Sequence, residues 1–126
     1  MKELTRAEEQ IMQILWKIGK GFVNDILENL PAPAPAYNTV STIVRILEQK
    51  GFVAHTAYGR THEYYPLISK KDYTRRYFRH FMTQYFGSYQ SLASFLTREE
   101  SLSLEELEEM RSVLEDEIQK KTNSHE

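Results

Sequence analysis

The stretch that decides the fold is Tyr37–Gly51, which reads YNTVSTIVRILEQKG. Branched aliphatic residues recur in it at i, i+3, i+4 and i+7, the spacing that places side chains on one face of a helix. Asn38 comes before them as a candidate N-cap, and Gly51 follows as a candidate C′ residue. The pattern therefore predicts an amphipathic helix that ends near Gly51. Its apolar face is Val40, Ile43, Val44 and Leu47.

The other face of this helix carries short hydrogen-bonding side chains and one guanidinium. No acidic residue occurs in it before Glu48. A helix that enters a DNA major groove needs small polar groups near its N-terminus and no negative charge facing the phosphates. The alternative is an ordinary amphipathic helix whose outer face is only solvated. The polar face consists of Thr39, Ser41, Thr42 and Arg45.

Two further helices are expected upstream. Thr5 and Glu8 have the spacing of a capping box at the start of the first, and Gly19 with Gly21 ends it. A shorter helix follows over about residues 23–30. The segment 31–36, PAPAPA, is expected to be extended because proline lacks an N–H and restricts φ. The inward positions are Ile11, Met12, Leu15 and Ile18, then Val23, Ile26, Leu27 and Leu30.

After Gly51 the apolar period changes to two, which predicts strands over residues 52–57 and 61–65. Tyr58-Gly59-Arg60 supplies the turn between them, and Pro66 ends the second strand. Three helices followed by a hairpin form a winged helix. Arg60 lies at the tip of the wing, where a guanidinium can reach a phosphate or a minor groove. The alternative for Arg60 is a turn residue that points into water.

The C-terminal part is expected to form two helices, over about residues 69–97 and 104–121. The first is rich in aromatic residues, with Gly87-Ser88 as a candidate kink, and a Ser103–Glu106 capping box begins the second. Two such helices cannot bury their apolar faces alone, so we expect them to intertwine with a second copy. The candidate dimerisation residues are Tyr77, Phe81, Tyr85, Leu107, Met110, Leu114 and Ile118.

Charge is unevenly distributed along the 126 residues. The net charge is −2, but residues 1–91 carry 12 Lys/Arg against 8 Asp/Glu, and residues 92–126 carry 4 against 10. A mildly basic N-terminal part is compatible with DNA binding. The sequence has neither a membrane-length apolar run nor the features of a signal peptide, and it contains no cysteine, so a cytoplasmic location fits. We expect a DNA-binding domain over residues 1–70 and a dimerisation region over residues 71–126.

Catalytic and metal sites are not predicted. His55 and His62 on the two wing strands could share a metal, but the nearby Glu63 is expected to point to the opposite face from His62. No Ser/His/Asp constellation, glycine-rich phosphate loop or pocketed carboxylate pair is found. The prediction is therefore a protein without a cofactor that is not an enzyme.

In combination, these residues resemble the penicillinase and methicillin-resistance repressors, the BlaI/MecI family of winged-helix regulators. The resemblance is specific over about residues 3–72 and looser beyond them. Its motifs are Leu4-Thr5-x-Ala7-Glu8 with Ile11-Met12 and Leu15-Trp16, Tyr37-Asn-Thr-Val40 with Leu47-Glu48-x-Lys50-Gly51-x-Val53, Gly59-Arg60 with Tyr64-x-Pro66, and Leu107 with Arg111 and Leu114.

The resemblance implies a homodimer that binds a palindromic operator and represses transcription. In the β-lactam branch of such repressors, a membrane sensor triggers cleavage at an Asn-Phe bond in the dimerisation region. This chain has Ser94-Phe95 at the corresponding place, so the resemblance leaves open whether it is cleaved. The copper-responsive branch uses a C-terminal cysteine cluster, and a chain without cysteine cannot use that inducer mechanism.

The sequence thus predicts a mainly α protein with a small β-hairpin, acting as a homodimeric repressor on double-stranded operator DNA. A membrane sensor-protease pathway is an expected partner only if the chain is cleaved, and no direct membrane insertion is expected. The alternative function is a winged-helix protein-interaction module without specific DNA binding. The candidate DNA contacts, which favour the repressor, are Asn38, Thr39, Ser41, Thr42, Arg45 and Arg60.

Overall fold

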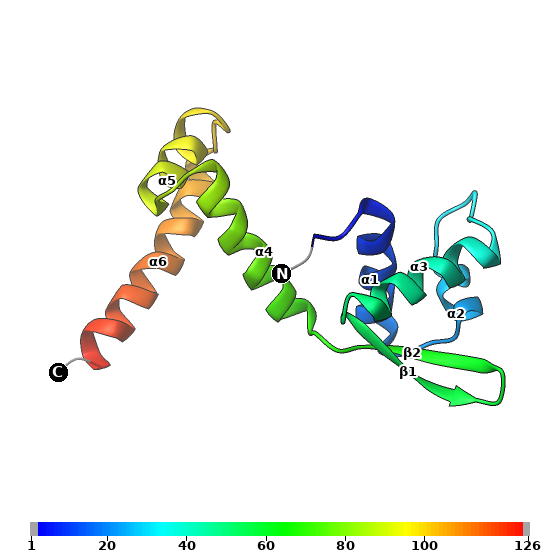
Figure 1. The fold of residues 1–126 in the computed structure, drawn as a ribbon. Helices are drawn as coiled ribbons and strands as arrows, with labels where there is room; N and C mark the ends of the chain where they lie inside the picture. The colour runs from blue at the N-terminus through cyan, green and yellow to red at the C-terminus, as the bar shows by residue number, and fades with distance from the viewer. Residues whose placement is uncertain (1–2, 125–126) are drawn as a thin grey trace. The chain divides into compact units, whose positions relative to one another are not determined.

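The structure, a computed structural model, describes residues 3–124 and divides into two compact units after Phe78 (Figure 1). The predicted mainly helical winged fold with one two-stranded antiparallel hairpin is confirmed. No helix of the described part is long and apolar enough to cross a membrane. The elements are α1 (Arg6–Ile18), α2 (Val23–Glu28), α3 (Tyr37–Gln49), β1 (Val53–Tyr58), β2 (Thr61–Pro66), α4 (Lys70–Tyr85), α5 (Tyr89–Arg98) and α6 (Leu104–Ser124).

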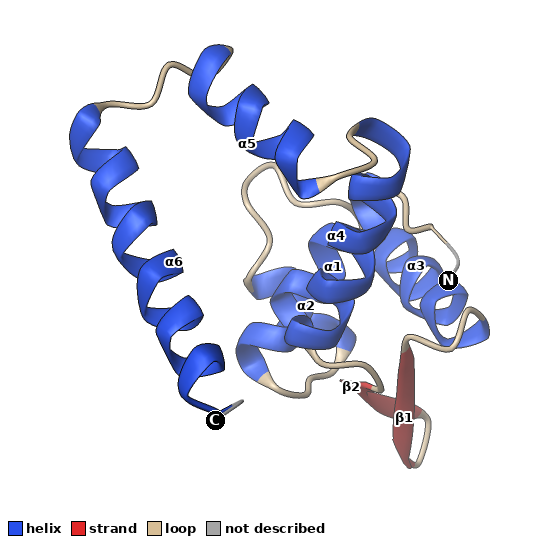
Figure 2. Cartoon of the chain, turned by 90° about the vertical axis from the view of Figure 1, so that its left-hand side faces the viewer, coloured by secondary structure: helices blue, strands red, loops and turns tan. Residues whose placement is uncertain are grey.

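Helix α1 begins with the expected capping box. The Thr5 hydroxyl accepts from the Glu8 N–H at 3.2 Å, and the Thr5 N–H donates to Glu8 Oε1 at 2.8 Å. Gly19 ends the helix with φ 88°, a conformation that favours glycine. Figure 2 shows α1, α2 and α3 as one packed group with the hairpin projecting beyond them.

The hairpin is joined to the helices through the turn between α1 and α2. Strands β1 and β2 pair from Val53 opposite Pro66 to Tyr58 opposite Thr61. Gly21 adds an isolated bridge, because its N–H donates to the Tyr64 carbonyl at 2.9 Å and its carbonyl accepts from the Tyr64 N–H at 2.8 Å. A Cβ at Gly21 would lie 2.8 Å from Ile18 Cδ1 and 3.1 Å from Asp25 Cβ, so a larger residue here would make these side chains shift.

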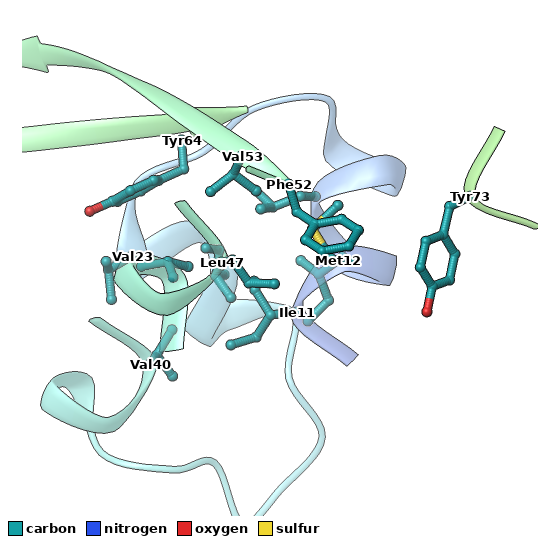
Figure 3. Packing of buried hydrophobic residues seen from close by; sticks show 13 residues of the cluster. Ile11, Met12, Val23, Val40, Leu47, Phe52, Val53, Tyr64 and Tyr73 are labelled. Atoms are coloured by element: carbon teal, nitrogen blue, oxygen red, sulfur yellow. The ribbon is translucent and has the colours of Figure 1, made fainter. Parts of the chain in front are cut away.

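The core of the first unit lies between the three helices and the base of the hairpin (Figure 3). Tyr73 from α4 completes it. Its ring centroid lies 5.4 Å from that of Trp16 and 6.1 Å from that of Phe52, while Trp16 Nε1 donates to the Ile68 carbonyl at 2.9 Å. The first turns of α4 are therefore part of the winged unit. The core residues with 0% exposure are Met12, Leu15, Ile26, Val40, Val44 and Leu47.

The expectation of one continuous helix over residues 69–97 is wrong. Helix α4 ends at Tyr85, because Gly87 adopts φ 77° and its N–H bonds to the Met82 carbonyl at 2.7 Å. Ser88 then caps α5 by accepting from the Ser91 N–H at 3.1 Å.

Helix α6 begins at the expected capping box. The Ser103 N–H donates to Glu106 Oε1 at 3.0 Å, and the Glu106 N–H donates to the Ser103 hydroxyl at 3.1 Å. The helix continues to Ser124, three residues past its expected end at 121. Fraying was expected over residues 123–126; Asn123 and Ser124 are helical, and residues 125–126 lie outside the described part.

Candidate nucleic-acid interface

A groove of about 310 Å³ lies between α2, the first three turns of α3 and the wing, which is β1, β2 and the turn between them. We call it the α3–wing groove. None of the residues that line it is acidic. They are Phe22, Val23, Asn24, Tyr37, Asn38, Ser41, Arg45, Arg60, Thr61, His62 and Tyr64.

The groove brings together four of the six candidate DNA contacts. Asn38, Ser41 and Arg45 line it from α3, and Arg60 lines it from the turn of the wing. Thr39 and Thr42 are exposed on α3 outside this lining. The Thr42 hydroxyl donates to the carbonyl of Asn38 at 2.9 Å. Four further polar lining residues were not predicted from the sequence as DNA contacts: Asn24, Thr61, His62 and Tyr64.

The expected N-cap role of Asn38 is wrong. Helix α3 begins at Tyr37, and its N-cap is Ala36, which has an extended backbone at φ −67° and ψ 153°. The proline-rich connector holds the chain extended only up to this residue, so Asn38 already lies inside the first turn. Alanine offers no side-chain acceptor, and the first N–H groups of α3 have no side-chain cap.

The expected exposed position of Ser41 is also wrong. Its side chain is buried, with 8% of the residue exposed, and its hydroxyl accepts from Arg45 Nη2 at 3.1 Å. Ser41 therefore orients the guanidinium of Arg45 one turn further along α3. Arg45 itself is exposed, and its guanidinium also hydrogen-bonds to the Tyr64 hydroxyl. A guanidinium has five N–H donors, so some remain for a ligand in the groove.

The groove has a positive electrostatic character. Besides the imidazole of His62, the only charged side chains of the lining are the guanidiniums of Arg45 and Arg60. Burial raises the pKa of the Tyr64 hydroxyl, and the Glu48 carboxylate adds to this effect, while the Arg45 guanidinium opposes it. Tyr64 therefore remains a neutral hydrogen-bonding group at the groove floor. Such a surface suits an anionic ligand that presents hydrogen-bond acceptors.

A partly buried ion pair holds the C-terminal end of α3 against α1. Lys50 Nζ lies 2.8 and 3.0 Å from the two carboxylate oxygens of Glu8, which is only 4% exposed. Burial alone would raise the pKa of Glu8, but hydrogen bonds from Lys50 and Thr5 outweigh it and hold that pKa below its ordinary value. The orientation of α3 thus depends on a charge pair as well as on apolar packing.

A second connection joins α3 to the wing. His55 Nδ1 lies 2.6 Å from Glu48 Oε2, and the ring of His55 stacks on that of His62 with centroids 4.0 Å apart and planes 7° apart. The two rings stack face to face, and no group of three potential metal ligands occurs within residues 3–124. The hairpin register indicates this stack. His55 pairs with Tyr64, and His62 lies two residues before Tyr64 on the same strand, so the two histidines are diagonal neighbours on one face.

The candidate dimerisation residues have different environments. Tyr77 belongs to the first unit and lies 6.2 Å from the ring of Tyr73, and Phe81 belongs to the second unit with its ring 5.1 Å from that of Tyr85. None of the residues of α6 is buried. The exposed fractions are 52% for Tyr77, 75% for Tyr85, 39% for Met110, 59% for Leu114 and 64% for Ile118, while Phe81 and Leu107 are half-buried.

The Ser94-Phe95 bond lies in the middle of α5. The ring of Phe95 packs on that of Phe86 with centroids 5.4 Å apart, yet Phe95 remains 39% exposed. No residue of α5 is buried. The bond is therefore in regular helix that has little tertiary support.

The chain is similar in sequence to known repressors. The Penicillinase repressor family profile matches residues 4–116. The methicillin resistance regulatory protein MecI of Staphylococcus aureus (strain N315) is 28% identical over 89% of this chain and 93% of its own. The penicillinase repressor of Bacillus licheniformis is 26% identical over 90% of this chain and 91% of its own. The solution structure of the DNA binding domain of the repressor BlaI is 28% identical, with a TM-score of 0.49, over 58% of this chain and 94% of that chain.

The profile match extends over most of the chain, which confirms the family that the sequence motifs indicated. The two relatives match at nearly full length, so the similarity includes the helices after the wing. The chain therefore belongs to the penicillinase repressor family, whose members are transcriptional repressors and not enzymes.

Proposed function

We propose that this chain is a homodimeric DNA-binding repressor that places α3 of each protomer in the major groove of a palindromic operator. The observation that carries the proposal is the α3–wing groove, where Arg45 and Arg60 converge on a surface without acidic residues. Backbone phosphates supply the anionic ligand that this surface suits, and base edges supply the acceptors that distinguish one sequence from another.

The two arginines have different parts in this proposal. Arg45 projects from α3 and is oriented by Ser41, so it is the candidate for a guanine edge or for a phosphate beside the major groove. Arg60 lies in the turn of the wing, where Thr61 stabilises the hairpin by donating its hydroxyl proton to the Tyr58 carbonyl at 2.8 Å. It reaches the adjoining backbone or minor groove. Thr39 and Thr42 complete the face of α3 turned to the DNA.

The second unit supports the dimer. Helix α6 has an apolar stripe in which Leu107 is half-buried and Met110, Leu114 and Ile118 are exposed. Their spacings of three and four residues place the stripe on one face. Exposed stripes of this kind are covered by another surface in a stable protein. A second copy covers it through a two-fold axis, and that symmetry requires an operator with two inverted half-sites.

Relief of repression by proteolysis near Ser94-Phe95 is part of the proposal, and it requires α5 to unwind. Because no residue of α5 is buried, its local opening costs little free energy. Limited proteolysis of the purified protein, with fragments identified by mass spectrometry, should place an early cut within α5. A first cut in the winged unit, with α5 intact, would contradict this part.

The test is fluorescence anisotropy with a duplex taken from upstream of the protein's own gene. At ~150 mM salt, the specific duplex should bind at least about 10³-fold more tightly than a random duplex. Arg45→Ala should weaken specific binding by about 1–3 kcal/mol if Arg45 contacts a base. Arg98→Ala, which removes the same charge from the end of α5, is the matched control and should leave affinity unchanged.

Two results would reject the repressor. Equal competition by specific and random duplexes would exclude sequence-specific binding. A monomer in sedimentation, with no effect of salt on a DNA titration, would favour the protein-interaction module instead.

A further inference from the structure

Three side chains form a continuous link from α3 to the α3–wing groove. Glu48 of α3 holds His55 of β1 through the 2.6 Å contact between Oε2 and Nδ1, and His55 stacks on His62 of β2. Tyr64 supports both rings, with centroids 5.6 Å from His55 and 6.2 Å from His62. His62 is the member of the link that lines the groove.

We propose that His62 contacts a backbone phosphate of the operator and that Glu48 and His55 are positioning residues for its ring. The inference rests on the proposed function, and it adds a third cationic group to Arg45 and Arg60. The stack and the carboxylate contact hold the imidazole in one orientation, so little side-chain freedom is lost when a phosphate arrives.

The contact makes operator binding depend on pH. Imidazole changes its charge between about pH 5 and 8, and a phosphate beside it stabilises the protonated form. Binding then takes up a proton, so affinity is highest at low pH and falls as rising pH removes that proton from the imidazole. A fully linked single proton changes affinity by up to about tenfold per pH unit.

Other charged groups act on the pair from each neighbouring element. Glu48 of α3 contacts His55 rather than His62, while Arg45 of α3 and Arg60 of the turn oppose further positive charge in the groove. Any positive charge on His55 would also oppose protonation of His62, because the two rings stack with centroids 4.0 Å apart. Glu63 lies in β2, where its carboxylate is 3.8 Å from Lys20 Nζ. Tyr37 and Tyr64 add hydroxyl groups to the lining, and burial raises the pKa of Tyr64, which therefore remains neutral over the same pH range. The phosphate is therefore the added charge that favours protonation of His62.

The experiment measures operator affinity and its salt dependence between pH 6 and 8 for the full chain and for His62→Gln. Glutamine retains hydrogen-bonding capacity and cannot become cationic. At pH 6, the slope of log K against log salt should fall by about one in His62→Gln, because one phosphate contact is lost, and at pH 8 the slopes should agree. His80→Gln, which removes a histidine from the second unit, is the matched control and should behave like the unaltered chain.

A double-mutant cycle tests the positioning role. If His55 orients the ring, the pH effect of His62→Gln should largely disappear in a His55→Ala background. Glu48→Gln is a milder second variant, should His55→Ala unfold, and it should reduce the same pH effect.

The outcomes separate this inference from the function on which it rests. Equal binding of the unaltered chain to operator and random duplexes would overturn both. Specific binding with the same pH and salt slopes in His62→Gln as in the unaltered chain would overturn only the role of His62. An undiminished His62→Gln effect in both the His55→Ala and the Glu48→Gln background would overturn the positioning role.

Discussion

The two units bury their apolar residues to very different degrees. In the first, six core side chains from α1, α2 and α3 have 0% exposure. Among described residues 79–124, only Met82 is buried. The first unit therefore has a core of its own, whereas the second exposes the apolar face that it would need for one. The difference fits the proposed function, in which the first unit binds DNA and the second joins two copies of the chain.

The largest expected effect compares one leucine from each unit. Leu47→Ala should lower the free energy of unfolding of the first unit by about 2–5 kcal/mol, because Leu47 has 0% exposure and its truncation leaves a cavity in the core. Leu114→Ala, at a residue 59% exposed, should hardly change that unfolding but should weaken the dimer. Urea unfolding followed by the fluorescence of Trp16, the single tryptophan, reports on the first unit alone, and sedimentation reports on the dimer.

Measurements at several protein concentrations separate the effects of these two substitutions. The Leu114→Ala defect in sedimentation should grow as protein concentration falls, while the Leu47→Ala defect in unfolding should not depend on concentration. A Leu114→Ala protein that loses as much stability as Leu47→Ala at every concentration would show that α6 is buried within one chain.

The next effect concerns the ion pair that orients α3. Glu8→Gln should destabilise the first unit by roughly 1.5–3 kcal/mol, because it weakens hydrogen bonds to a charged partner. In the unaltered chain the pKa of Glu8 is lowered from 4.5. The stabilisation of the fold by the Glu8 carboxylate is therefore complete above the pKa of Glu8 in the unfolded chain. It is lost as pH falls through the lower pKa of Glu8 in the folded chain.

Urea unfolding at pH 7 and in steps below pH 4.5 measures this dependence. The difference between the unaltered chain and Glu8→Gln should shrink as the solution is acidified. A difference that stays constant down to acid pH would mean that the charge of Glu8 does not stabilise the fold.

The smallest effect compares the two capping boxes. Thr5→Ala should cost about 1 kcal/mol of first-unit stability, because α1 packs in the core and its loss is cooperative. Ser103→Ala removes the same motif from α6, where neighbouring side chains are exposed, and should only fray the first turn. Trp16 fluorescence detects the first change, and amide hydrogen exchange detects the second. A matching cooperative loss in both variants would contradict the distinction between the units.

Many local features of the fold were predictable from the sequence. Both capping boxes, the positive φ of Gly51 after α3, and the hairpin turn at Gly59 depend on residues a few positions apart. The break after Tyr85 was underestimated as a kink, because Gly87-Ser88 signals an interruption without indicating its size. The N-cap of α3 was misplaced because Asn38 is a better cap by residue type than Ala36.

The polar face of α3 was predictable from the sequence, but the α3–wing groove was not. Helical periodicity placed Ser41 beside the other polar residues of α3, yet packing of α2 and the wing around α3 buries it beneath Arg45. The stack of His55 and His62 requires the strand register, and the Glu8–Lys50 pair joins residues 42 positions apart. None of these contacts follows from helix or strand period alone.

The sequence by itself determined the three helices and the hairpin of the first unit, the two arginines of the candidate interface and the family, because each depends on neighbouring residues or on motif spacing. The tertiary structure decided which polar side chains of α3 remain accessible, how Arg45 is held, and what connects Glu48 to the wing. The physical reason is that burial, ion pairing and ring stacking depend on distances between elements, and these distances exist only once the core has closed.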